Sequence, residues 1–178
     1  MIVRLLLALA LTSAGTKFHS IGDGAYPPGS RITFTQRELN TYIQSEMKNT
    51  IGPGVRNGHV EIGTGNIVRG ALYIDFLKVR QAHGDPPGWL LSQLLAGERP
   101  VAITARLTSS NGHGRVDLLK VEVSKVAAEG RTLDFLIENF VIPTFPDIIV
   151  NRDFALGFNI DRIELRPGLA TVVLSGKR

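Results

Sequence analysis

The sequence predicts an α+β domain in which a curved antiparallel sheet of about five to seven strands packs on two or three helices. Segments of alternating apolar and polar residues follow one another through Gly-rich turns, which is typical of antiparallel hairpins. Helical periodicity is confined to a few segments. The chain has 178 residues, 43 % of them hydrophobic and 20 % charged, which suffices for one domain with its own core.

The beginning of the chain has the pattern of an export signal. Arg4 precedes the apolar stretch Leu5–Leu11, and small residues follow it, as a secretory signal peptide requires. We expect cleavage within Ala14–Gly24 and a location in the periplasm or cell envelope; a retained anchor and a buried first element are the alternatives. The expected division is a signal peptide over residues 1–14, a flexible Gly- and Pro-rich leader over residues 15–30, and a single domain over residues 31–176.

The first predicted helix begins after a short strand at Arg31–Phe34. Thr35 and Glu38 have capping-box spacing, and Phe34 with Leu39 fits a hydrophobic staple. Gly52-Pro53-Gly54 is expected to end this helix. The predicted apolar face consists of Leu39, Tyr42, Ile43 and Met47, and the predicted polar face of Gln36, Arg37, Gln44, Lys48 and Asn49.

Three hairpins are expected after this helix. The first joins the Val60 region to a long strand over Ile67–Val79. That strand would place Leu72, Ile74 and Phe76 on one side and a solvated Asp75 on the other. The second hairpin joins Pro100–Thr108 to Arg115–Val126, whose shift in apolar phase indicates a β-bulge. The third turns at Pro167-Gly168, between strands expected at Asp161–Leu165 and Ala170–Leu174, and a further strand is expected near Asp153–Ile160.

Two further helices are predicted. One begins near Pro86, carries Trp89 and Leu94, and ends at Gly97. It is apolar nearly all round, which suits a core helix, a lid, a membrane contact or a partner-binding face. The other covers about Leu133–Val141 with Thr132 as its cap, and it carries Phe135 and Phe140.

The sequence contains no recognisable catalytic or metal motif. Cysteine is absent, which excludes disulfides, thiolate zinc sites and thiol nucleophiles. The four histidines lie in turn-rich contexts without metal-ligand spacing, and no nucleophile elbow or phosphate-binding loop occurs. We therefore expect a protein that is not an enzyme and uses no cofactor. The net charge of +4 favours anionic lipid surfaces, whereas no stripe of aromatic and basic residues indicates nucleic-acid binding.

Several stretches together resemble small exported bacterial envelope proteins of unassigned function. The stretches are Ile32–Asn40, Ala71–Phe76, Leu91–Val101, Leu133–Phe140 and Ile163–Gly168. More loosely, a helix followed by long curved strands is similar to the tubular (BPI-like) lipid-binding proteins. That resemblance implies a sheet that curls around a helix and leaves an apolar groove for acyl chains.

Two functions follow as hypotheses. The first is binding of a lipid-like apolar ligand or a membrane surface, because the surplus apolar residues would otherwise be exposed to water. The second is a structural or assembly role in the envelope, with the apolar helix docking on another protein. The residues expected to line the ligand site are Leu72, Ile74, Phe76, Trp89, Leu94, Phe135 and Phe140.

Overall fold

The computed structural model of the chain describes residues 13–49, 54–82, 97–138 and 149–176. The described residues form nine strands and four helices, and the predicted α+β class is confirmed. The first helix covers residues 13–22. The other elements are β1 (Arg31–Thr35), α2 (Gln36–Asn49), β2 (Val55–Ile62), β3 (Ile67–Ile74), α3 (Phe76–Ala82), β4 (Arg99–Ser110), β5 (His113–Val123), β6 (Val126–Ala128), α5 (Gly130–Leu136), β7 (Asp153–Ala155), β8 (Ile160–Arg166) and β9 (Leu169–Leu174).

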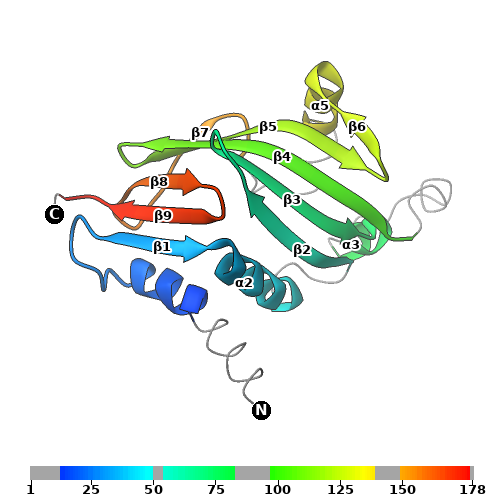
Figure 1. The fold of residues 1–178 in the computed structure, drawn as a ribbon. Coiled ribbons are helices and arrows are strands. Elements are labelled where there is room, and N and C mark those ends of the chain that lie inside the picture. The colour runs from blue at the N-terminus through cyan, green and yellow to red at the C-terminus, as the bar shows by residue number, and fades with distance from the viewer. Residues whose placement is uncertain (1–12, 50–53, 83–96, 139–148, 177–178) are drawn as a thin grey trace, which may run out of the picture.

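The strands divide into two open antiparallel sheets (Figure 1). A six-stranded sheet has the order β2-β3-β4-β5-β6, with β7 paired to β5, and matches the predicted size. A three-stranded sheet has the order β1-β9-β8. The sheets meet where Ser109 of β4 contacts β8: its Oγ donates to the Ile163 carbonyl at 2.9 Å and accepts from the Ile163 N–H at 2.7 Å. One hydroxyl thus bridges an edge of the small sheet to the large one.

The predicted hairpins and the β-bulge are present. β2 pairs with β3, β4 with β5, and β8 with β9. In the second hairpin Ala105 faces Leu118 but Thr104 faces Lys120, so Leu119 is the extra residue of the bulge. The bulge corrects the shift in apolar phase, because an added residue returns Val121 and Leu118 to the same side of the sheet.

The best-buried core lies against the three-stranded sheet and includes the helix over residues 13–22. Phe34 is only 1 % exposed, and the Phe18 ring stacks on it with centroids 4.6 Å apart. Tyr42 of α2 contacts the same Phe18 ring. The buried members of this core, called the first core below, are Ala14, Ile21, Ile32, Phe34, Val172 and Leu174.

The packed helix differs from the expected flexible leader over residues 15–30. Ala14 is fully buried and Ile21 nearly so, which means that the segment contributes to the core rather than preceding it. Apolar side chains at helical spacing explain the difference, since they bury against the three-stranded sheet. Signal-peptide cleavage within Ala14–Gly24 stays a prediction, and it would remove these contacts.

Glu38 joins the first helix to α2. The predicted capping box is present: Glu38 Oε2 accepts from the Thr35 N–H at 2.8 Å, and Thr35 Oγ1 accepts from the Glu38 N–H at 3.2 Å. Glu38 Oε1 accepts from Lys17 Nζ at 2.8 Å and from the Ser13 hydroxyl. Burial acts to raise the pKa of Glu38, but the hydrogen bonds from Lys17, Ser13 and Thr35 lower it to about 2.

The strand predicted over Ile67–Val79 is wrong beyond Ile74. The strand ends there and α3 begins at Phe76, with Asp75 buried between them. Asp75 Oδ1 accepts from the Lys78 N–H at 3.1 Å, which is the bond of a helix cap. The carboxylate therefore starts a helix and does not lie on a solvated strand face, as the alternation had indicated.

The helix predicted from Leu133 begins earlier, at Gly130, and Glu129 rather than Thr132 occupies its cap position. Leu133 and Ile137 are buried as expected. The predicted helix around Trp89 lies outside the described residues. Among the described helices, none combines the length and the apolar character that crossing a membrane demands.

Candidate binding surface on the six-stranded sheet

The strand register gathers apolar side chains on one face of the six-stranded sheet. Residues directly paired across antiparallel strands point to the same side. Leu72 pairs with Val101 and Val101 with Val123, and the next rows repeat this apolar pairing across β3, β4 and β5. This surface, called the apolar face below, comprises Val60 and Ile62 of β2, Val68, Gly70 and Leu72 of β3, Val101, Ile103, Ala105 and Leu107 of β4, and Val116, Leu118, Val121 and Val123 of β5.

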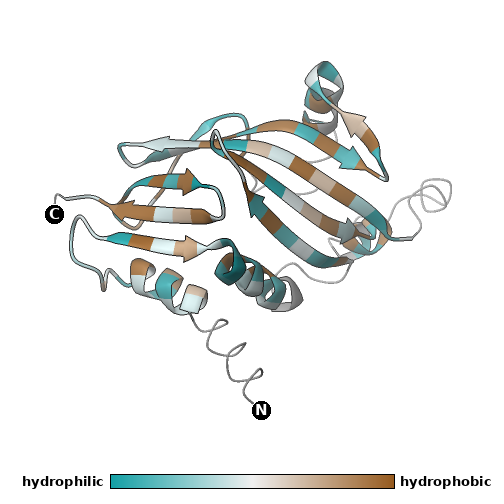
Figure 2. Ribbon diagram, in the orientation of Figure 1, coloured by the Kyte–Doolittle hydropathy of each residue, from teal (hydrophilic) through white to brown (hydrophobic). Residues whose placement is uncertain are grey.

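The opposite face of the same strands is mostly polar. Brown and teal bands alternate along β4 and β5 in Figure 2, as expected for a sheet with unlike faces. Arg115 pairs with Asp117 at 2.7 Å, and Lys120 with Glu122 at 3.3 Å. The residues on this face include Arg69 and Tyr73 of β3, Thr104, Arg106 and Thr108 of β4, and Arg115, Asp117, Lys120 and Glu122 of β5.

The apolar face is incompletely covered. Val101 and Ile62 are buried, but Leu72 and Ile103 in the middle of the face are only half-buried. The rows of half-buried side chains continue through Val68, Ala105, Leu107, Val116, Val121 and Val123. The apolar face is thus partly shielded and partly accessible to water.

A short helix covers one end of the apolar face. Leu133 and Ile137 pack with Ala128 of β6, and Leu118 and Val121 of β5 flank this cluster. Figure 1 places α5 beside β5 and β6, away from β2. The cluster closes the β5 end of the face, while the rows on β3 and β4 lie farther along the sheet.

The edge of β2 is closed by polar side chains of α2. Asn40 Nδ2 donates to the Val60 carbonyl at 3.0 Å, and Asn40 Oδ1 accepts from the Val60 N–H at 2.6 Å. Gln36 Oε1 accepts from the Ile62 N–H at 2.9 Å, and Gln44 Nε2 donates to the Gly58 carbonyl. These amides at i, i+4 and i+8 take the hydrogen bonds that a further strand would make. Gln36 and Gln44 were predicted only as members of the polar helix face, so their bonds to β2 were not foreseen.

The predicted ligand-site residues are only partly brought together. Leu72 lies on the apolar face, and Ile74 is on the same side of β3, half-buried at its end. Phe76 is half-buried at the start of α3 and is not on the strand. Phe135 belongs to α5, without a description of its side chain. Trp89, Leu94 and Phe140 lie outside the described residues.

The apolar rows on β4 and β5 were missed as site residues, although a signal for them existed. Val101, Ile103, Ala105 and Leu107 alternate along one strand, which had indicated only a half-buried strand. Their partners across the bulge do not share this alternation. Only the register shows that both runs form one surface.

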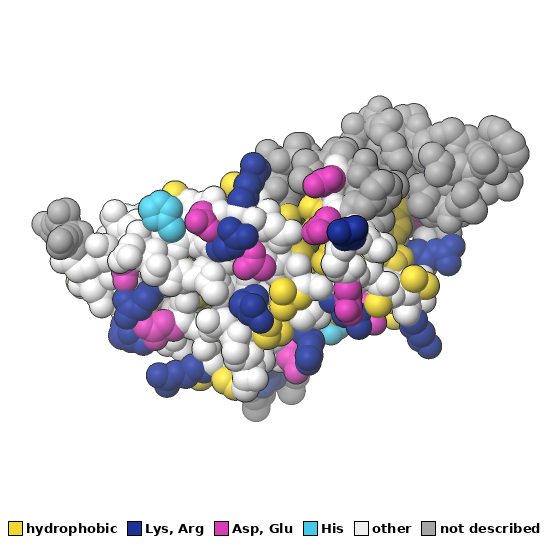
Figure 3. Space-filling view, turned by 90° about the horizontal axis from the view of Figure 1, so that it is seen from above, with side chains coloured by type: hydrophobic (Ala, Val, Ile, Leu, Met, Phe, Trp, Pro, Cys, Tyr) yellow, Lys and Arg dark blue, Asp and Glu magenta, His cyan; other side chains and the backbone are white. Residues whose placement is uncertain are grey.

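Basic and acidic side chains lie close together over the described part of the surface. On the side seen in Figure 3, basic and acidic side chains are intermixed rather than gathered into one patch. Arg56 pairs with Glu98 and lowers the pKa of its carboxyl, but both groups are exposed and their pairing adds little stability. Within the described ranges, no three His, Asp or Glu side chains lie together as a metal site would require.

Among the described residues, the apolar face of the six-stranded sheet is the candidate site considered below. The rows assigned to the apolar face contain only apolar residues and Gly70, and the next row at the start of β4 pairs Ile74 with the charged Arg99. A comparison of the chain with family models, curated proteins and solved structures finds no match to any of them.

Proposed function

We propose that the chain is an exported envelope protein that binds a lipid-like amphiphile on the apolar face and has no catalytic role. The observation that carries the proposal is the partly open apolar face itself. Its rows run through Leu72 and Ile103, which are half-buried although Val101 and Val121, their neighbours across the strands, are also apolar. Such side chains gain stability when a ligand removes the rest of their surface from water.

The shape of the face favours an extended ligand. From Val101 to Leu107 the face spans seven residues of β4, a length of roughly 20 Å at the usual rise of a strand. It crosses β3, β4 and β5, where α5 covers its β5 end and α2 closes the β2 edge. An acyl chain can lie along such a surface and contact its apolar rows over their length.

The charge of the protein favours an anionic head group. The chain carries 20 basic and 16 acidic residues, a net charge of +4. A basic protein is attracted to anionic lipids and to the surfaces that contain them. The proposed ligand class is thus a fatty acid or an anionic phospholipid, whose chain contacts the apolar face.

Substitutions on the two faces of β4 test the proposal. Ile103→Asp introduces a carboxylate in the middle of the apolar face, and Thr104→Asp introduces the same group on the opposite face of the adjacent position. We expect Ile103→Asp to weaken binding of a fluorescent palmitate analogue at least tenfold, and Thr104→Asp to leave it within twofold of the wild type. Thermal unfolding of both variants checks that they fold, and Ile103→Ser replaces Ile103→Asp if the latter does not.

The same experiment distinguishes the proposal from the alternative functions. Equal palmitate affinity in the Ile103 and Thr104 variants, or no binding to the wild type, overturns the proposal. Sedimentation with phosphatidylglycerol vesicles separates a bound single lipid from attachment to a membrane surface. Absence of lipid in both assays, together with a defined cross-linked complex in the envelope, would support the assembly-partner hypothesis instead.

A further inference from the structure

A strained turn holds an exposed aromatic ring beside β8. Gly157, Phe158 and Asn159 have φ values of 71°, 47° and 56°, all in the left-handed region. This region suits Gly and Asn, but it is costly for Phe, by about 1–3 kcal/mol. Phe158 is nevertheless 66 % exposed, so burial of its ring does not compensate for the strain.

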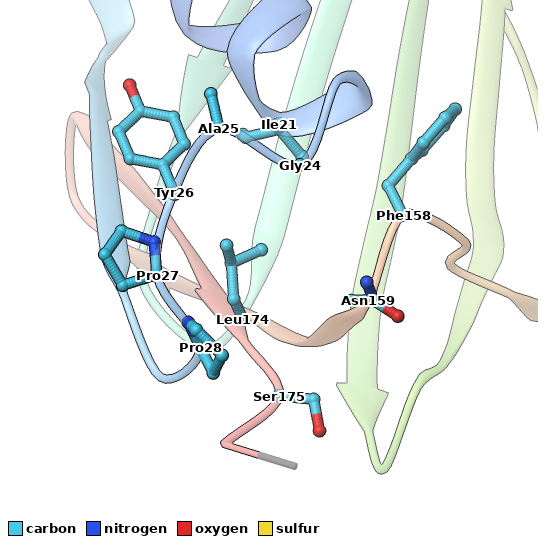
Figure 4. A pocket seen from close by; sticks show the side chains of 10 residues that line it. All are labelled: Ile21, Gly24, Ala25, Tyr26, Pro27, Pro28, Phe158, Asn159, Leu174 and Ser175. Atoms are coloured by element: carbon cyan, nitrogen blue, oxygen red, sulfur yellow. The ribbon is translucent and has the colours of Figure 1, made fainter. Parts of the chain in front are cut away.

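The Phe158 ring stands at a pocket that is separate from the apolar face. The pocket has a volume of about 360 Å³ and lies between the end of the first helix, the turn before β8 and the end of β9. In Figure 4, Tyr26 and Pro27 line one side and Phe158 and Asn159 the other, with Leu174 between them. This volume lies within the range of small-molecule sites, which is about 300–1,000 Å³.

Backbone hydrogen bonds fix the walls of the pocket. The Ile160 N–H donates to the Gly157 carbonyl at 2.9 Å, and the Ser175 N–H donates to the Asn159 carbonyl at 2.8 Å. The Gly29 N–H donates in turn to the Ser175 carbonyl at 3.0 Å. These bonds tie the turn before β8 to β9 and β9 to the 26–30 loop, so the pocket is formed before any ligand enters.

The lining selects for an uncharged ligand. None of the lining side chains is charged, and the polar lining residues are Tyr26, Asn159 and Ser175. A charged molecule in this pocket would lose hydration without gaining an opposite charge. The apolar and ring-bearing side chains that line it are Ile21, Tyr26, Pro27, Pro28, Phe158 and Leu174.

We infer that this pocket, called the Phe158 pocket, is a binding site for a small, uncharged molecule that contains an aromatic or alicyclic ring. Phe158 covers the ligand by stacking on it, and the strained turn keeps the ring at the rim in the absence of ligand. The ring edge also approaches the first helix, because a methyl group added at Gly22 would lie 3.9 Å from Phe158 Cε1. The site is independent of the proposed lipid function, since none of its residues belongs to β2–β6.

Replacement of Phe158 separates a binding role from a structural one. Phe158→Gly removes both the ring and the left-handed strain, so the variant is expected to unfold at the same or a higher urea concentration than the wild type. Its affinity for the neutral fluorescent probe N-phenylnaphthylamine is expected to fall at least tenfold. Phe158→Tyr keeps the ring and is expected to bind the probe within threefold of the wild type.

Two further variants define where the probe binds. Leu169→Ala, at the opposite end of β9 from Leu174, is the control for loss of an exposed apolar side chain and is expected to retain affinity. Ile103→Asp, which is designed to abolish palmitate binding, is expected to retain probe binding. The inference is overturned if the wild type does not bind the probe saturably, if Phe158→Gly binds it as well as the wild type, or if Ile103→Asp alone abolishes binding.

Discussion

The two sheets differ in how completely they are buried. In the three-stranded sheet, Ile32, Phe34, Val172 and Leu174 are all buried against the helix over residues 13–22. In the six-stranded sheet, every described side chain of β3 is half-buried or exposed, and on β4 Val101 is the buried exception. The sheet with fewer strands thus holds the better-packed core.

This difference indicates a division of roles. A small sheet covered by two helices has its apolar side chains removed from water and stabilises the fold. A large sheet with one apolar face and incomplete cover keeps a surface that a ligand can complete. Fold stability and the proposed binding then depend on different residues, which makes the comparison open to test by substitution.

The largest expected effect compares one residue from each sheet. Phe34→Ala should lower the free energy of unfolding by about 3–5 kcal/mol, because it leaves a cavity in the first core. Ile103→Ala should cost only about 1–2 kcal/mol, because the side chain is already half-exposed. Urea unfolding of the two variants measures both values. Equal losses would show that the two sheets are packed alike.

A pH series tests how much the Glu38 carboxylate stabilises the fold beside the first core. The pKa of Glu38 is about 2 in the folded protein, below its usual value of 4.5, so its stabilisation is complete above pH 4.5 and disappears as the pH falls towards 2. The difference sets an upper limit of about 3 kcal/mol, which water around the partly exposed carboxylate reduces. Glu38→Gln should therefore be less stable than the wild type at pH 7 by up to this amount.

The stability difference between Glu38→Gln and the wild type should shrink between pH 4.5 and pH 2, because the protonated wild-type side chain then resembles the amide. Thermal unfolding at each pH gives the difference. A stability gap that stays constant down to pH 2 would mean that the carboxylate is not held by Lys17, Ser13 and Thr35 in solution.

A smaller effect is expected at the edge of the large sheet. Asn40→Leu removes both hydrogen bonds to Val60 and should cost about 2 kcal/mol, because a backbone N–H and a carbonyl lose their partner. Thr41→Ala is the matched control, since the Thr41 hydroxyl bonds only to Arg37 of its own helix. Urea unfolding should show a loss below about 0.5 kcal/mol for the control. A similar loss for both would assign the effect to helix propensity rather than to the sheet edge.

Local signals in the sequence predicted most of the elements. The capping box of Thr35 and Glu38, the turn at Pro167-Gly168 and the bulge at Leu119 all depend on residues close together along the chain. Asp75 shows the limit of such signals, because alternation placed it on a strand whereas it caps α3. The competing signal was that the Asp75 carboxylate can also cap a helix. The surrounding packing decides between a strand position and a cap.

By itself, the sequence determined the α+β class, the hairpins and the apolar character of the strands, because alternation and turn chemistry are local properties. Only the tertiary structure decided that the strands form two sheets, that residues 13–22 enter the first core, and that Gln36, Asn40 and Gln44 close the edge of β2. Those outcomes depend on partners distant in sequence. The register of β3, β4 and β5, which joins their apolar residues into one face, depends on such partners as well.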